Sequence, residues 1–217
     1  MAQTVLRKSG FLTVANALTF ARPLRPLRQI VLHQSRDVRL PLRLLRNAWW
    51  SRTPARKSMQ GWSVAAATDD WAGPSMLIGE RDEGFIHYLR QCPSARLLSF
   101  HILHEGRRSG FFALSVVGEQ ARLAGVMLEK PDPEYWRIAF CLAQDAVLSY
   151  TGTSELVART TAEPAFIAAA QAGMRMRKQS PVFLFRKIDA GDDLPLQFQL
   201  WDNDSVFLGS RGPGFLT

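Results

Sequence analysis

The chain has 217 residues, of which 47% are hydrophobic and 21% are charged, a balance that is typical of a folded globular protein and excludes a wholly disordered one. No apolar run approaches the roughly 18 to 20 residues that are needed to cross a bilayer. The two cysteines, Cys92 and Cys141, lack the spacing of a metal site or a disulfide framework, so they indicate reduced thiols in a cytoplasmic protein.

The formal net charge of +8 is unevenly distributed. Residues 1–58 hold 12 of the 27 Lys and Arg residues, with Asp37 as their single acidic residue, whereas residues 59–217 are slightly acidic. This asymmetry predicts two parts with different roles, the first of which is a basic, partly amphipathic arm or linker over residues 1–58.

The basic arm also carries apolar residues, in two stretches that are separated by prolines. In the second stretch the spacing predicts a helix over residues 42–51 that begins near Pro41, because proline is tolerated in the first turn of a helix but not in its interior. On a helix, one face would carry Arg39, Arg43 and Arg46, with Leu45 and Trp49 as an apolar counterpart.

Four interpretations of this arm stay open. It docks on the body or on a partner domain through Leu and Trp; it binds an anionic membrane surface, which would make the protein peripheral to a membrane; it binds nucleic acid by neutralising phosphates; or it is a cleaved organelle-targeting peptide. All four agree with a segment that is rich in Arg and poor in acidic residues.

Beyond the arm, hydrophobic periodicity and turn residues predict an alternation of strands and helices. The predicted strands cover residues 62–67, 96–103, 110–117, 121–128, 155–159, 174–177 and 182–186, and the predicted helices cover residues 83–91, 135–150 and 164–173. Short turns that contain glycine join the strands between residues 96 and 128, which indicates antiparallel pairing. The helix over residues 135–150 has the clearest apolar face.

This order of elements resembles the GNAT-type N-acyltransferase family over residues 62–187. Residues 156–159 and 164–175 look like the family's late strand, helix and turn. Residues 80–93, together with the basic, Trp-containing residues 46–50, are similar to the C-terminal half of relatives with two GNAT-like domains in one chain. The resemblance implies an α/β (α+β) fold with a mixed, largely antiparallel sheet flanked by helices.

The resemblance also implies a domain organisation and partners. We expect a GNAT-like domain over residues 59–188 and, over residues 189–217, a C-terminal extension that packs on this domain and covers its sheet or cleft. The expected partner is a second GNAT-like domain or another copy of the chain.

In the family, acetyl-CoA or another acyl-CoA binds where the fourth strand splays from the fifth. The resemblance places this site on the backbone of the strand over residues 121–128, and its phosphate loop at residues 129–134, where Lys130 is the only cation. The backbone positions implied are Ala124, Gly125, Val126 and Met127. The loop, however, has no glycine, two prolines and three acidic residues, and this chemistry predicts weak coenzyme A binding or none.

Two side chains are candidates for a catalytic role. Glu155 begins a predicted strand near the cleft, where a carboxylate could deprotonate an amine, and His101 lies on a strand and carries an imidazole, the side chain that most often serves as a general base. We expect no metal site, because His101 and His104 have no third ligand at a suitable spacing. Two functions therefore remain open: an acyl-CoA-dependent N-acyltransferase, or half of a tandem one, and a non-catalytic docking module of the same fold.

Overall fold

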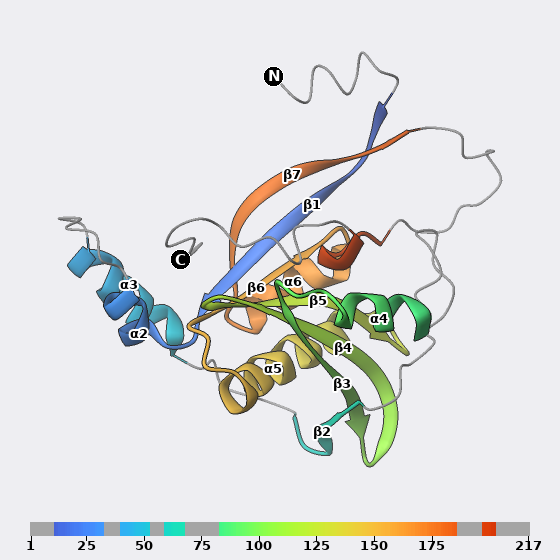
Figure 1. The fold of residues 1–217 in the computed structure, drawn as a ribbon, viewed down its shortest axis with the longest axis horizontal. Helices are drawn as coiled ribbons and strands as arrows, with labels where there is room; N and C mark the ends of the chain where they lie inside the picture. Colours follow the sequence, from blue (N-terminus) through green and yellow to red (C-terminus); the bar gives the residue numbers. More distant parts are fainter. Residues whose placement is uncertain (1–10, 33–39, 53–58, 68–82, 186–196, 203–217) are drawn as a thin grey trace.

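The computed structural model describes residues 11–32, 40–52, 59–67, 83–185 and 197–202, and it contains one seven-stranded sheet in the order β2-β3-β4-β5-β6-β1-β7 (Figure 1). The strands are β1 (Phe11–Pro23), β2 (Trp62–Ala66), β3 (Arg96–His104), β4 (Arg107–Val117), β5 (Gln120–Leu128), β6 (Glu155–Thr160) and β7 (Arg175–Phe185). The helices are α2 (Pro26–Leu32), α3 (Leu40–Ser51), α4 (Glu83–Arg90), α5 (Pro133–Tyr150) and α6 (Glu163–Gln171), with a 3-10 turn η1 (Leu200–Asp202). In the described ranges no helix combines the length and the apolar character of a bilayer-spanning segment.

All the neighbouring strands pair antiparallel except β5 and β6, which are parallel. The predicted mixed, largely antiparallel sheet with flanking helices is therefore confirmed. Every residue of β5 is buried, as expected for a strand at the centre of a sheet with both faces covered.

The two faces of the sheet bury separate apolar clusters, because successive side chains of a strand point to opposite faces. Phe112 packs with Trp136 and Phe140 of α5 on one face, together with the alanines of α6. On the other face, the neighbouring Phe111 packs with Ile86 of α4 and with Trp201 of η1. The second face is where the candidate site lies.

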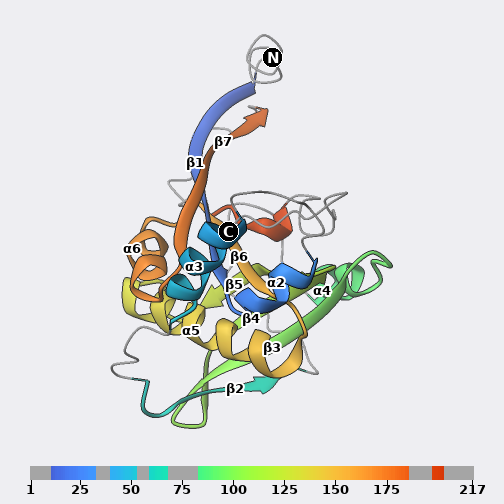
Figure 2. The same cartoon turned by 90° about the vertical axis from the view of Figure 1, so that its left-hand side faces the viewer.

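Strand β1 lies inside the sheet, between β6 and β7, and pairs antiparallel with both (Figures 1 and 2). Residues 11–23, which the sequence analysis places in the basic arm, are therefore part of the sheet. Ala17, Phe20 and Ala21 are all buried, so both faces of this strand are covered and it lacks the alternation that identifies a half-exposed strand.

The last two predicted strands form the single strand β7 at the edge of the sheet. Pro181 pairs with Asn16 of β1 close to a register shift. Proline is tolerated at this kind of position, because an edge strand leaves one row of backbone groups outside the ladder.

A buried arginine connects β1 to three other elements. Arg22 is 2% exposed. Its Nη1 donates to the side chain of Gln144 on α5 and to the carbonyl of Ala172 after α6, and its Nη2 donates to the carbonyls of Ser51 and Arg52 at the end of α3. The guanidinium group thus donates to carbonyl groups at the ends of two helices, and the carbonyl of Ala172 also accepts from Nε2 of Gln144 at 2.9 Å.

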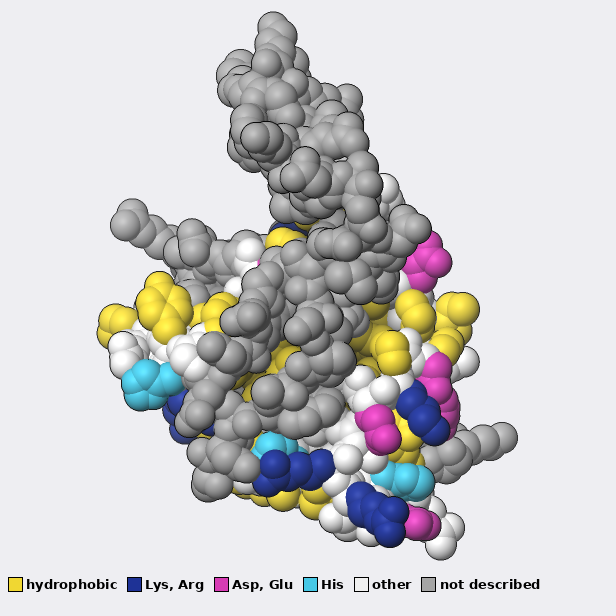
Figure 3. Space-filling view, turned by 90° about the vertical axis from the view of Figure 1, so that its right-hand side faces the viewer, with side chains coloured by type: hydrophobic (Ala, Val, Ile, Leu, Met, Phe, Trp, Pro, Cys, Tyr) yellow, Lys and Arg dark blue, Asp and Glu magenta, His cyan; other side chains and the backbone are white. Residues whose placement is uncertain are grey.

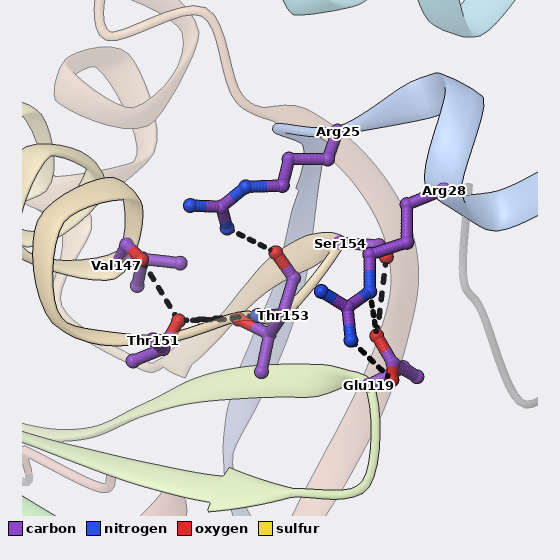
Figure 4. A network of polar contacts seen from close by, with 7 residues as sticks. All are labelled: Arg25, Arg28, Glu119, Val147, Thr151, Thr153 and Ser154. Atoms are coloured by element: carbon purple, nitrogen blue, oxygen red, sulfur yellow. Dashed lines mark hydrogen bonds and ion pairs between the residues drawn. The ribbon is translucent and has the colours of Figure 1, made fainter.

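Helix α2 is held against the connection between α5 and β6 (Figure 4). Arg25 donates to the carbonyls of Thr153 at 2.6 Å and Leu148 at 2.7 Å. Arg28 forms an ion pair with Glu119 at 3.0 Å, in which the side chains are 47% and 29% exposed.

These two arginines are expected to contribute unequally to stability. Arg25→Ala should lower the free energy of unfolding by about 1–2 kcal/mol, because charge-assisted bonds to two carbonyls are lost. Arg28→Ala should lower it by about 0–1 kcal/mol, because an exposed ion pair is screened by water. Urea titrations of both variants test the difference, and an equal loss would show that the contacts of Arg25 are no stronger than the surface pair.

Candidate functional site

The site begins where β5 separates from β6. The two strands pair in parallel from Gln120 and Glu155 to Leu123 and Ala158. The next residue of β5, Ala124, is a bulge against β4, since Leu114 pairs with Leu123 while Ala113 pairs with Gly125. A bulge bends its strand and increases its twist, and β5 therefore leaves β6 with a gap beyond Leu123.

A glutamine from the end of the described chain fills this gap. The amide N–H of Val126 donates to Oε1 of Gln199 at 2.5 Å, and Nε2 of Gln199 donates to the carbonyl of Val126 at 2.8 Å. Gln199 is 2% exposed. Its side-chain amide therefore makes the two hydrogen bonds that a neighbouring strand would make with Val126.

The backbone around Gln199 is attached to the other side of the gap. Gln199 forms an isolated antiparallel bridge with Thr160 at the end of β6. The amide of Phe198 donates to Oγ1 of Thr161 at 2.9 Å, and the amide of Thr161 donates to the carbonyl of Phe198 at 3.0 Å. Residues 197–202, called the closing segment below, thus connect β5 and β6 across the gap.

Trp201 packs the closing segment onto β5. The indole is 3% exposed and lies over Gly125, where a Cβ atom would be 2.0 Å from the ring. Phe85 of α4 contacts the same indole edge-on, with ring centroids 5.9 Å apart. The position therefore requires glycine because of a close approach, and any side chain at residue 125 would displace Trp201.

In the loop between β5 and α5, side chains of the protein itself bind the groups that would otherwise be available to the phosphates of acyl-CoA. Asp132 caps α5, with its Oδ1 accepting from the amide of Tyr135 at 2.9 Å, and Pro133 has no amide N–H. The carboxylate of Glu134 is bonded to Arg137 at 2.6 Å, and this hydrogen bond raises the pKa of Arg137. Lys130 is exposed. The positive end of the helix dipole is thus already complemented by carboxylates of the chain.

The cap gives a stability prediction. Asp132→Ala should cost about 1 kcal/mol, because it leaves a first-turn amide of α5 without its side-chain acceptor, and Asp132→Asn should cost less, because asparagine also caps helices. Thermal unfolding of the two variants tests this, and an alanine variant as stable as the asparagine variant would contradict the capping role.

The backbone positions that the resemblance implies for acyl-CoA binding lie together at the gap, whereas the two catalytic candidates lie away from it. Ala124, Gly125, Val126 and Met127 follow the point of separation. Glu155 lies at the opposite, paired end of β6, about 13 Å from Arg159 at about 3.3 Å per residue. His101 lies on β3, two strands from β5 and so about 10 Å away.

Both catalytic candidates are buried in contacts within the sheet. Glu155 is 0% exposed and accepts from Nε2 of Gln120 at 2.8 Å. Burial lowers the pKa of Arg122 nearby, while the charge of Glu155 acts to raise it. His101 is 4% exposed and meets Phe111 edge-on at 6.0 Å. His101 lies in register with Phe111 of β4, which in turn lies in register with Met127 of β5, so it shares the face of the site at a distance of two strands.

Within the described residues no group of three or more His, Cys, Asp and Glu side chains could hold a metal ion. Sequence reasoning did not identify Gln199 or Trp201 as site residues. The available signal was Gly125, since a glycine within a buried strand indicates a close approach by another part of the chain.

The order of elements from β2 to β7, with the body's fourth strand β5 leaving its fifth strand β6, agrees with the order that the resemblance to the GNAT-type family implies. Among solved structures, a GCN5-related N-acetyltransferase from Anabaena variabilis ATCC 29413 is similar at 9% identity and a TM-score of 0.47, over 83% of this chain and 42% of that chain. A GCN5-related N-acetyltransferase from Kribbella flavida is similar at 10% identity and a TM-score of 0.45, over 83% and 62%. The chain thus spans less than two thirds of the length of either protein. No protein-family model matches the sequence, and no curated protein does.

Proposed function

We propose that the described domain is a non-catalytic GNAT-fold module whose acyl-CoA groove is closed by its own residues 197–202. The observation that supports this most strongly is the pair of hydrogen bonds between the side-chain amide of Gln199 and the backbone of Val126. An acyl-CoA in the position that the resemblance implies would need the same backbone groups. Binding would therefore require removal of two buried hydrogen bonds and of a buried tryptophan.

The chemistry of the phosphate loop supports the same proposal. The first turn of α5 is capped by Asp132 and preceded by Pro131, and Glu129 and Glu134 add negative charge. A diphosphate placed there would meet carboxylates rather than free amides, with Lys130 as the loop's one cation. The residues present therefore do not fit the phosphates of coenzyme A, and no reaction step is derived through that cofactor.

One observation favours a second candidate, an acyl-CoA-dependent N-acyltransferase in which the closing segment moves. The bulge at Ala124 and the gap beyond Leu123 are both present, and Gly125 has no side chain to obstruct the groove. In this alternative the closing segment regulates access. A second GNAT-like domain, whether in one chain with this domain or contributed by another copy, would then be the source of the missing phosphate site.

Calorimetric titration with acetyl-CoA distinguishes the two candidates. The wild-type protein should give no saturable heat up to millimolar cofactor. Saturable micromolar binding that is weakened by Lys130→Ala would contradict the proposal and would favour an acyl-CoA-dependent N-acyltransferase instead. Binding seen only in a folded Trp201→Ala variant would favour the second candidate, in which the groove is competent but closed.

A further inference from the structure

Helix α3 has three large apolar side chains on its outer side. Leu42, Leu45 and Trp49 are 70%, 71% and 63% exposed, respectively. The buried side of the helix carries Asn47, which is 3% exposed and donates to Gln29 of α2 at 2.8 Å. The pattern is the reverse of that expected for a helix that only covers a core. Helices α2 and α3 lie together at one side of the molecule (Figures 1 and 2).

Three arginines surround the other tryptophan of this helix. The guanidinium carbons of Arg46, Arg177 and Arg175 lie 4.4, 5.5 and 5.9 Å from the ring centroid of Trp50. Arg46 comes from α3, whereas Arg175 and Arg177 are two residues apart on β7 and so share one side of that strand. Together the four residues form the Trp50 cluster, in which one indole ring brings together three positive charges from distant parts of the chain.

The charges of this cluster are not neutralised by the described parts of the chain. No carboxylate of a described residue lies within 4.0 Å of Arg46, Arg175 or Arg177. Burial lowers the pKa of Arg46, and the charges of Arg177 and Arg43 lower it further. An anion beside the three guanidinium groups would therefore relieve their mutual repulsion, and phosphate is one of the anions whose geometry matches the planar guanidinium.

We propose that α3 and the Trp50 cluster bind the surface of an anionic phospholipid membrane. Arg46, Arg175 and Arg177 hold lipid phosphates, while Leu42, Leu45 and Trp49 enter the interface between the headgroups and the acyl chains. This surface lies outside the gap between β5 and β6, so the inference does not depend on the closed groove.

The combination of charge and apolar side chains selects lipid over nucleic acid. Arginine with exposed leucine and tryptophan is the composition of helices that lie in a membrane interface. A nucleic acid would use the arginines but would leave the two exposed leucines in water, without a gain in buried apolar area. On the opposite side of the molecule, basic, acidic and histidine side chains are interspersed (Figure 3). Such a mixed surface attracts neither negatively nor positively charged partners in preference.

Flotation with lipid vesicles tests the proposal on the full chain. The protein should bind vesicles of phosphatidylcholine with phosphatidylserine and not vesicles of phosphatidylcholine alone. Because each basic residue near the surface contributes about a fivefold factor, Arg175→Gln with Arg177→Gln should weaken partitioning about 25-fold. Trp49→Ser should weaken it without changing the charge.

The matched control is Arg107→Gln with Arg108→Gln, which removes the same charge from exposed positions at the β3–β4 hairpin. This control should partition within about twofold of the wild type, and circular dichroism should show that every variant is folded. Three results would overturn the proposal: no binding of the wild type to anionic vesicles, an equal loss in the two double variants, or binding of a duplex DNA that is sensitive to Arg175 and Arg177 without vesicle binding.

Discussion

Replacing Arg22 by alanine is expected to lower the free energy of unfolding by about 2–3 kcal/mol, because several acceptors in the interior lose hydrogen bonds from a charged donor. The guanidinium reaches α5, the end of α6 and the end of α3. Its removal takes this donor from the buried Oε1 of Gln144 and from the carbonyls of Ser51 and Arg52, and it leaves a space at the junction of β1 with the helices. Urea titration monitored by circular dichroism measures the loss.

Two further variants control for charge and for surface position. Arg22→Lys keeps the charge but loses the planar fork of donors, so it should also be clearly destabilised. Arg28→Ala, which removes a half-exposed ion pair from the next helix, should stay within about 1 kcal/mol of the wild type. If Arg22→Ala were as stable as Arg28→Ala, Arg22 would not be the connection that holds β1 to the body.

Replacing Trp201 by alanine should cost about 3–5 kcal/mol, the usual range for a large aromatic side chain in a core. The indole is 3% exposed and packs on Gly125 and Phe85. Trp49→Ala is the matched control, because that tryptophan is 63% exposed and a surface substitution should change stability by about 0.5 kcal/mol or less.

A double-mutant cycle shows whether Trp201 and Gly125 are in contact. Gly125→Ala alone should cost about 1–3 kcal/mol, because the added methyl group collides with the indole. In the Trp201→Ala background the same change should cost little, so the two effects should not add. Additive effects would mean that the closing segment does not lie on β5.

The body of the fold was predictable because its elements have local signals. The antiparallel strands β3, β4 and β5 are joined by short turns, and α5 has a continuous apolar face. Strand β1 was not predictable in this way. Its neighbours β6 and β7 lie more than 130 residues away in the sequence, and a strand that is covered on both faces lacks the alternating pattern that marks a strand.

In the candidate site, too, some residues could be predicted from the sequence and others could not. The backbone positions at Gly125 and Val126 follow from the resemblance of the element order, and the structure places them at the gap. Gln199 accepts a hydrogen bond from Val126, which lies 73 residues earlier in the chain. No sequence pattern identifies the hydrogen-bond partner of a single glutamine amide. The positions of Glu155 and His101 depend on strand register, which periodicity alone does not specify.

Hydrogen exchange at the amide of Val126 tests the closed groove most directly. If Gln199 accepts from this amide, exchange should be strongly protected in the wild type, and Gln199→Ala should raise its rate while leaving that of Met127, whose amide faces β4, unchanged. An amide of Val126 that exchanges at the same rate in the wild type and in the Gln199→Ala variant would contradict the account, because the groove would then be open in solution.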